Sequence, residues 1–311
     1  MMNNNKFLLF LLCSLLLIKS NAQDLQAFEL TDSWLDTIAS LAPEKPTVAT
    51  NERKRILIFS LHTGYNHWVI PHTEAVMKLL ATRTGIAECT TSMDIASFEK
   101  ASLKNYDAII MNNTCPERDH RNLFYDVLKA DSTLTEAMRF DKAQQLENNL
   151  MEFVRKGGGL MLLHGGATVQ NNSRQFSEMT GGSFDFHPKQ QMIQVKLVDP
   201  AHPLVQAFKG KGFEHIDEPY FYKNAYDSYN FRPLLYMEAD ELEGLDHKIA
   251  VNKRYLAWIK RFGKGRIFQA APSHNAQSYS NPALLQFFQD GMQYVLGQLD
   301  CDDSPVGKAP Q

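Results

Sequence analysis

The sequence has few cysteines and none of the common catalytic signatures. Its four cysteines are too few and too widely spaced for a disulfide framework or a zinc motif. No HExxH, GxSxG or GK[ST] is present, and no GxGxxG follows an expected strand. A zincin helix, a serine-hydrolase elbow, a phosphate loop and a nucleotide cofactor are therefore not expected. The spacing does not fix whether any two of Cys89, Cys115 and Cys301 form a disulfide.

An apolar run long enough to cross a bilayer is also missing. The run from Phe7 to Ile18 is shorter than the roughly 20 residues that a membrane span needs. Lys6 precedes it, and Ser20 to Ala22 supplies the small residues that a signal peptidase reads. We expect a signal peptide over residues 1–22, cleaved near Ala22, and a secreted or periplasmic protein without a membrane span.

No excess of positive charge is present either. The chain has 32 Lys and Arg against 35 Asp and Glu, and the leader removes Lys6 and Lys19, which leaves 30 against 35 and a net charge of −5. This balance gives no support for nucleic acid or an anionic membrane as a partner. The 289 residues that remain of 311 are enough for one large α/β domain or two small ones.

The mature chain divides into three parts. Residues 23–52 hold one amphipathic stretch and two prolines, which predicts an N-terminal helix and a linker. Residues 53–299 form the main domain. The polar tail, residues 300–311, is expected to be disordered.

Short apolar runs alternate with helical patterns in the first half of the main domain. Three runs read as buried strands: 55–60, 107–111 and 159–163. Helical periodicity follows the first run and returns over 144–156, and the charged segment 115–140 is expected to add a surface helix and loop. This order predicts an α/β, doubly wound, mostly parallel sheet with helices on both faces.

The sequence pattern changes after residue 190, where shorter strands with alternating polar and apolar residues are expected. Four shorter strands are expected there: QMIQVKLV, LLYMEAD, YLAWIKRF and RIFQAAP. They read as an antiparallel extension of the same sheet, and residues 281–299 read as a closing amphipathic helix.

The chain is organised around residues 157–167, GGGLMLLHGGA. A strand buried on both faces ends there at His164, and Gly165 and Gly166 tolerate tight backbone geometry. This arrangement is typical of a strand-to-helix elbow, and ligands bind beyond the carboxyl ends of strands in open α/β sheets. The alternative is a core strand that ends in a structurally hydrogen-bonded histidine.

Other histidines also follow expected strand ends. His62 and His67 come after the first strand, His187 lies in a glycine-led loop, and His274 follows RIFQAAP. With a parallel sheet, these loops and the pair Asp217–Glu218 can converge in one cleft. An isolated loop histidine is more often exposed or structural. His72, on the first turn of a helix, is expected to face solvent, and His202 and His215 are expected to have no functional role.

Histidine serves as acid, base or metal ligand near neutral pH, and carboxylates orient it or share the metal. The expected catalytic residues are His67, His164, His187, Asp217, Glu218 and His274. The set that would hold a divalent metal such as zinc is His164, His187, Glu218 and His274. The expected substrate-binding residues are Tyr65, Asn113, Gly165, Gly166 and Tyr220, with backbone amides near the two glycines as oxyanion donors.

Six segments, in this order, resemble the ThuA-like (trehalose utilisation) family from about Arg55 to Gly297. They are SLHTGYNHWVIP, GGGLMLLHGGA, GGSFDFHP, DPAHPLVQAF, HIDEPYFY and AWIKRFGKGRIFQAAPSHNAQSYSNPALLQFF. The resemblance implies a flavodoxin-like fold similar to class I glutamine amidotransferases. In that wider group a cysteine occupies the elbow and a histidine follows a late strand. In this sequence His164 occupies the elbow and His274 follows the late strand. No cysteine at the elbow can supply a thiolate nucleophile, so the covalent thioester route is not expected.

The resemblance implies a role in saccharide metabolism. The favoured hypothesis is an enzyme that acts on a disaccharide or keto-sugar by histidine and carboxylate acid–base chemistry, assisted by a metal. The alternative is a non-catalytic carbohydrate-binding or accessory protein on the same scaffold. A hydrolase that uses Ser60 or Ser273 is disfavoured, because neither serine has an elbow sequence. The sequence does not give the oligomeric state.

Overall fold

A computed structural model describes residues 25–246 and 249–307, and the expected signal peptide lies outside the described residues. The strands are β1 (Lys54–Phe59), β2 (Ala87–Ser92), β3 (Ala108–Asn112), β4 (Gly159–Leu163), β5 (Ser183–Phe184), β6 (Gln191–Leu197), β7 (Phe213–Asp217), β8 (Tyr222–Lys223), β9 (Arg232–Glu238), β10 (Lys253–Phe262) and β11 (Gly265–Ala270). The α-helices are α1 (Asp32–Leu41), α2 (Ile70–Thr84), α3 (Lys100–Leu103), α4 (Leu123–Leu128), α5 (Glu136–Arg155), α6 (Arg174–Thr180) and α7 (Pro282–Val295). Short 3-10 helices are η1 (Ile95–Phe98), η2 (His164–Thr168), η3 (Pro203–Phe208), η4 (Asn224–Ser228), η5 (Ala239–Glu241) and η6 (Ala276–Ser280).

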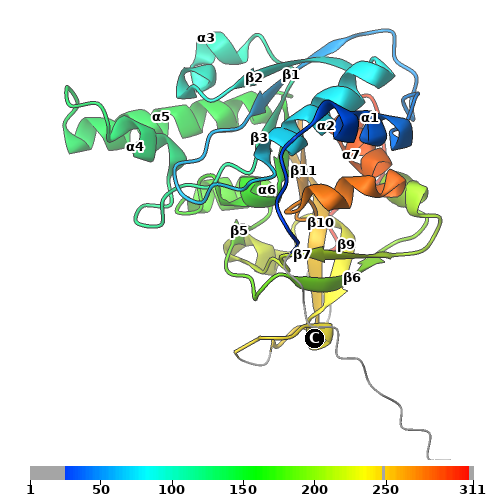
Figure 1. The fold of residues 1–311 in the computed structure, drawn as a ribbon. Helices are drawn as coiled ribbons and strands as arrows, with labels where there is room; N and C mark the ends of the chain where they lie inside the picture. The colour runs from blue at the N-terminus through cyan, green and yellow to red at the C-terminus, as the bar shows by residue number, and fades with distance from the viewer. Residues whose placement is uncertain (1–24, 247–248, 308–311) are drawn as a thin grey trace, which may run out of the picture.

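Within the described residues, nine strands form one sheet in the order β2-β1-β3-β4-β11-β10-β9-β6-β7 (Figure 1). The first five strands pair in parallel, and each later pairing is antiparallel. The order of the parallel part is that of flavodoxin-like sheets. The sequence therefore predicted the fold class correctly: a doubly wound α/β sheet with an antiparallel extension.

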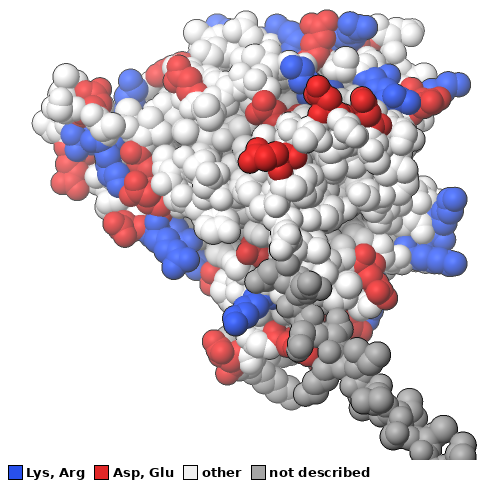
Figure 2. All heavy atoms as spheres, in the orientation of Figure 1, with Lys and Arg blue, Asp and Glu red and all other residues white. Residues whose placement is uncertain are grey.

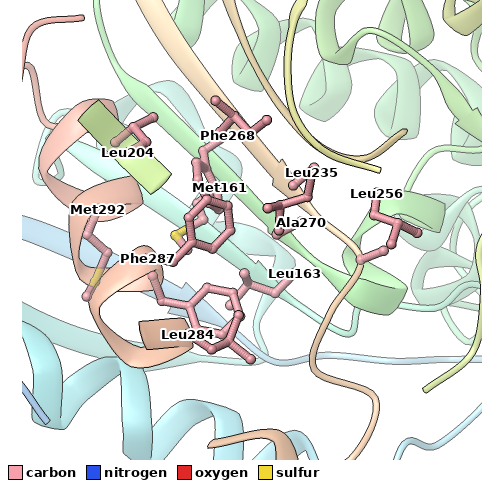
Figure 3. Packing of buried hydrophobic residues seen from close by; sticks show 14 of the residues in the cluster. Met161, Leu163, Leu204, Leu235, Leu256, Phe268, Ala270, Leu284, Phe287 and Met292 are labelled. Atoms are coloured by element: carbon pink, nitrogen blue, oxygen red, sulfur yellow. The ribbon is translucent and has the colours of Figure 1, made fainter. Parts of the chain in front are cut away.

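Helices cover both faces of the parallel strands (Figure 1). On one face α2 and α7 bury a large apolar cluster, in which Leu284, Phe287 and Met292 of α7 lie beside Met161 of β4 and Phe268 of β11 (Figure 3). On the other face α3, α4 and α5 bury a second cluster. Each fully buried Leu, Met or Phe side chain contributes about 1.5–3 kcal/mol to folding. The many such side chains in the two clusters stabilise the packing of the helices on the sheet, which holds the strand ends in fixed positions.

Three strands of the nine-stranded sheet differ from the expectation, and the short pair β5 and β8 was not predicted. β11 was placed in the antiparallel extension, but it pairs in parallel with β4 from Arg266↔Gly159 to Ala270↔Leu163. β2 and β7 were not predicted, because each is a short strand at an edge of the sheet. β2 has only one fully buried residue and β7 is mostly part-buried, so neither shows a clear apolar run.

Two helices also differ. α5 begins at Glu136 rather than near Gln144, since its first two turns are mostly exposed and lack apolar periodicity, while the Thr135 hydroxyl caps its N-terminus. α4 was expected on the surface, but Leu123 and Phe124 are buried and it packs against α5.

The N-terminal segment packs on the domain through aromatic rings. Phe28 and Trp34 each lie 4.9 Å from the ring of His72, and Trp68 lies 5.2 Å from it. His72 was expected to face solvent, but it is 1% exposed. The expectation was wrong because the face of α2 that carries His72 is covered by α1 and the preceding segment, which the local sequence of α2 does not reveal.

Residues 300–307 do not show the expected disorder. Asp303 pairs with Arg261 and accepts a hydrogen bond from the hydroxyl of Tyr294, and the Val306 amide donates to the Phe231 carbonyl oxygen. These contacts tie the described part of the tail to α7, β10 and the loop before β9. Polar composition suggested disorder, but the polar groups have partners.

Acidic and basic side chains are interspersed around the margins of the face in Figure 2, and most of its centre is uncharged. No helix within residues 25–246 and 249–307 is both long and apolar enough to cross a membrane. Cys89, Cys115 and Cys301, the cysteines that the structure describes, are all unpaired.

Candidate functional site

The sheet directs four loops to one edge. β1, β4 and β11 run in parallel, and four antiparallel steps through β10, β9 and β6 bring β7 back to the same direction. The carboxyl ends of β1, β4, β7 and β11 therefore share an edge, which is where open α/β sheets bind ligands. These ends are followed or closed by His67, His164, Asp217–Glu218 and His274.

The turn after β4 is a sharp strand-to-helix elbow, as the sequence predicted. His164 has φ 45° and begins η2 directly after the strand. This left-handed backbone is unfavourable for a residue with a Cβ, and such conformations cluster at functional sites. The imidazole of His164 is completely buried at this point.

The residues next to His164 build the elbow. A Cβ on Gly165 would lie 2.8 Å from Cys115 Sγ, and one on Gly166 would lie 2.3 Å from the Met111 carbonyl oxygen. The Gly165 amide donates to Asn113 Oδ1 at 3.3 Å, and Asn113 is fully buried. Asn113, Gly165 and Gly166, expected to bind substrate, thus shape the turn in this structure, and the Gly165 amide is not free to act as an oxyanion donor.

Four side chains converge at this edge. One ligand atom from each of His67, His164, Glu218 and His274 lies within 4.8 Å of all the others. His164 Nε2 lies 3.2 Å from Glu218 Oε2 and 3.1 Å from His274 Nδ1, and His274 Nδ1 lies 3.3 Å from Glu218 Oε2. We call these four residues the His/Glu cluster.

The tautomer of His164 follows from its partners. Its Nδ1 lies 2.8 Å from the Ala271 carbonyl oxygen, which can only accept, so Nδ1 carries a proton and donates it. Nε2 then faces a carboxylate oxygen and a ring nitrogen of His274. Opposed lone pairs repel, so these three atoms need either a proton on one of the two ring nitrogens or a metal cation between them.

Burial and charge set the protonation of the cluster. Burial, with the nearby His164 and His274, lowers the pKa of His67 to about 2. Burial and the charge of His164 also lower the pKa of His274. Burial alone would raise the pKa of Glu218, but its hydrogen bond with His164 and the histidine charges lower it to about 2. At neutral pH the cluster thus holds His67 and His274 as neutral imidazoles and Glu218 as an ionised carboxylate.

His164 responds in the opposite direction. Burial would lower its pKa, but the hydrogen bond to Glu218 and the charges of Asp217 and Glu218 outweigh burial and raise it. The negative charges of Asp217 and Glu218 therefore create a negative electrostatic potential at His164. Three imidazoles and one carboxylate are a donor set that divalent zinc and similar metals accept, so the cluster could hold such an ion.

The cluster differs by one residue from the predicted metal set. His67 belongs to it, and His187 lies outside it, with Nε2 3.7 Å from Glu218 Oε2. His187 Nδ1 lies 2.9 Å from the Pro188 carbonyl oxygen and therefore donates to it, which leaves Nε2 as an acceptor. The side chain of His187 is 33% exposed, so it lies at the wall of the site. His62 is not part of the cluster either.

Asp217 was expected to be catalytic, but its contacts are those of a positioning residue. It is 1% exposed, and its Oδ1 accepts from the Glu218 amide at 2.8 Å. Its Oδ2 accepts from the amides of Ser273 and His274 at 3.0 and 3.4 Å. The carboxylate therefore fixes the loops that carry Glu218 and His274 relative to one another. His215, expected to have no role, lies 3.4 Å from the same oxygen.

A cavity of about 600 Å³ opens on the cluster. His67, His187 and Glu218 lie in its wall together with Tyr65, Cys115, Arg118, Arg121, Phe184 and Tyr220. Tyr65 is 62% exposed with its ring 4.6 Å from that of His67, and the buried ring of Tyr220 lies 4.3 Å from that of His164. A second cavity of about 620 Å³ lies at the opposite ends of the strands, and none of its lining residues is a histidine or cysteine.

Cys115 is a site residue that the sequence analysis missed. Its Sγ lies 3.7 Å from His67 Nδ1 and 3.6 Å from the Gly165 carbonyl oxygen, to which the thiol can donate. His67 Nδ1–H can then donate to the sulfur, which leaves Nε2 with its lone pair. Burial raises the pKa of Cys115 to about 11, so it is a neutral thiol at pH 7. Its place just after the β3 strand end was the available signal.

The fold and the site together define a flavodoxin-like α/β protein with a buried histidine–carboxylate site at the carboxyl edge of its sheet. The chain belongs to the ThuA family, described as trehalose utilisation, which it matches over residues 55–295. The resemblance seen in the sequence is thereby confirmed. No curated protein matches the chain.

Three solved structures share the fold. A ThuA-like protein from Bacteroides uniformis is 16% identical, with 80% of this chain and 94% of that chain covered and a TM-score of 0.58. A ThuA-like protein from Parabacteroides merdae is 15% identical, with 84% and 94% covered and a TM-score of 0.54. A cytoplasmic protein from Salmonella typhimurium is 16% identical, with 78% and 98% covered and a TM-score of 0.51. At these identities the likeness concerns the fold alone.

Proposed function

We propose that this protein is an exported enzyme of saccharide metabolism that holds a divalent metal in the His/Glu cluster and acts on a disaccharide or keto-sugar in the adjoining cavity. The observation that carries the proposal is the convergence of three imidazoles and one carboxylate within 4.8 Å at the base of a cavity of about 600 Å³. Membership of a family linked to trehalose utilisation supports a sugar as the ligand.

His67, His164, Glu218 and His274 would hold the metal. Bound there, it would supply Lewis-acid polarisation of a sugar carbonyl or hydroxyl, or lower the pKa of a water molecule. The hydrogen bond from His164 Nδ1 to the Ala271 carbonyl oxygen fixes the ring so that Nε2 faces the cluster, which is the usual arrangement of a ligating histidine. Asp217 fixes the backbone on which Glu218 and His274 stand.

Two residues of the wall can act on the sugar. His187 donates from Nδ1 to the Pro188 carbonyl oxygen, so its Nε2 is available to take a proton from a hydroxyl or from a carbon beside a carbonyl. The exposed ring of Tyr65 offers a face on which a pyranose can stack. With histidine and glycine at the elbow, the proposed chemistry is proton transfer rather than acyl transfer.

The test is a saccharide panel assayed with protein that has been stripped with a chelator and then reloaded with Zn²⁺, Mn²⁺ or Mg²⁺. Turnover of at least one disaccharide or keto-sugar is expected only after reloading, and His187→Gln should lower kcat while leaving metal content unchanged. His120→Ala is the matched control, because the His120 ring packs on Tyr125 and Phe140 and does not belong to the cluster. Saccharide binding without turnover under every condition would contradict the enzyme and favour a carbohydrate-binding protein.

Export is a separate part of the proposal, based on the apolar run and small residues before Gln23. N-terminal sequencing of the protein recovered from the medium or periplasm is expected to begin at Gln23. Recovery of full-length chain from the cytoplasm alone would overturn export and leave the site chemistry untouched.

A further inference from the structure

We propose that the ligand of this cavity carries an anionic group, a carboxylate or a phosphate, and that Arg121 pairs with it. The inference rests on the proposed saccharide function and names its substrate class as an acidic saccharide. It comes from one wall of the cavity, the segment 115–121 between β3 and α4.

In this wall of the cavity a glutamate has an ion-pair partner, whereas the two arginines have none in the described part of the chain. Arg118 and Arg121 both line the cavity, and neither forms an ion pair with any residue in the described part of the chain. Glu117, in the same wall, is neutralised by contact with Lys129, and its amide is tied to Asp126. Two further carboxylates line the cavity: Asp119 is exposed, and Glu218 contacts His164 and His274 of the cluster. A half-buried guanidinium is thus left facing the cavity without a counter-charge.

The backbone of Arg121 points to a role for its side chain. Arg121 has φ 52°, a left-handed conformation that glycine or asparagine adopts at less cost than arginine. The position is fixed, because its amide donates to the Glu117 carbonyl oxygen at 3.1 Å and its carbonyl accepts from the Asn172 amide at 3.2 Å. The turn therefore holds Arg121 at a fixed place in the cavity wall.

Arg121 is also close to the cluster. It lines the same cavity as His67 and Glu218 of the cluster and as Cys115, whose Sγ lies 3.7 Å from His67 Nδ1. A ligand paired with Arg121 can therefore extend along one cavity wall to the His/Glu cluster. The exposed Tyr65 ring lies beside His67 along this path and can cover a sugar ring between the two ends.

Guanidinium is the side chain best suited to such a ligand. Its fork of N–H donors matches the two oxygens of a carboxylate or phosphate, and the pair is stronger where water is partly excluded. Uronic acids and sugar phosphates share this chemistry with one another and differ from neutral sugars. The cluster would engage the reacting end of such a molecule and Arg121 its anionic end.

Isothermal titration of the leaderless protein with three disaccharides tests the inference: neutral trehalose, trehalose 6-phosphate and a glucuronate-containing disaccharide. At least one anionic compound should bind about tenfold or more tightly than trehalose. The compound that does so identifies phosphate or carboxylate as the group. Arg121→Gln, which keeps a Cβ at the left-handed position, should abolish the preference and leave metal content unchanged.

Arg118→Gln is the matched control, because it removes the same charge from the exposed part of the same wall. It should keep most of the preference. Equal binding of neutral and anionic compounds by the wild type, or an equal loss in Arg118→Gln and Arg121→Gln, would overturn the pairing while the saccharide function stands. Failure of all three compounds to bind would instead contradict the saccharide function itself.

Discussion

His164 Nε2 and His274 Nδ1 lie 3.1 Å apart although 110 residues separate them in the chain. The contact exists because β4 and β11 are parallel neighbours whose carboxyl ends coincide at Leu163 and Ala270. A buried pair of ring nitrogens at hydrogen-bond distance, with a carboxylate oxygen beside both, has to share a proton or bind a common cation. The chemistry proposed for the site follows from this relationship.

Removal of the Asp217 charge is expected to loosen both loops that carry cluster ligands. Asp217→Asn keeps one acceptor oxygen but replaces the other with a donor that faces backbone amides, so the free energy of unfolding should fall by about 1–3 kcal/mol. Metal affinity should fall as well, although Asp217 is not a ligand. Denaturant unfolding and metal titration measure the two effects.

Asp227→Asn is the control, since Asp227 is exposed in η4 and remote from these amides. If Asp217→Asn matched that control in both measurements, the positioning role would be refuted.

The elbow should not tolerate a side chain at Gly166. A Cβ there would lie 2.3 Å from the Met111 carbonyl oxygen, a backbone atom that cannot move independently. Gly166→Ala is therefore expected to lower the free energy of unfolding by roughly 1–3 kcal/mol through overpacking and to displace His164. Gly244→Ala, at a positive φ with open space around it, should cost less, on the order of 1 kcal/mol. Thermal unfolding compares the two, and an equal loss would argue against the close approach.

The free energy of unfolding should depend on pH, because burial in the folded protein lowers the pKa of His67. Its pKa is about 2 in the folded protein and about 6.5 in the unfolded chain, so the unfolded chain binds one more proton between these values. Stability of the chelator-treated protein therefore falls as pH drops below about 6, by up to roughly 1.4 kcal/mol per pH unit from this group.

His67→Gln removes that contribution. The slope of unfolding free energy against pH between about pH 4 and 6 should become shallower by about the same amount. The slope is the readout, because the substitution also changes the overall stability. Parallel curves for the two proteins would show that His67 is not held neutral.

The sequence predicted the parts of the site that depend on topology. Apolar runs located β1, β3 and β4, and the rule that parallel strands share an edge brought His67 and His164 together before any contact was known. β2 was not predicted, because a polar edge strand has no clear apolar pattern. The parallel direction of β11 was not predicted, because the pairing of a strand depends on the whole sheet.

Side-chain roles were harder to predict than loop positions. His67 and His187 both stand in loops that follow short strands, yet His67 belongs to the cluster and His187 lies at the cavity wall. Asp217 and Glu218 are neighbours with the same charge, yet one accepts backbone amides and the other faces the histidines. These differences arise from local dihedral angles and packing, which residue type and spacing do not encode.

Metal content of the purified protein, measured by elemental analysis with and without reloading, tests the central claim most directly. Wild type should bind about one divalent ion per chain, and His164→Ala, His274→Ala and Glu218→Gln should each lose most of it, while His120→Ala retains it. Wild-type protein that binds no divalent ion under reloading, with a melting temperature indifferent to chelator and metal, would contradict the account.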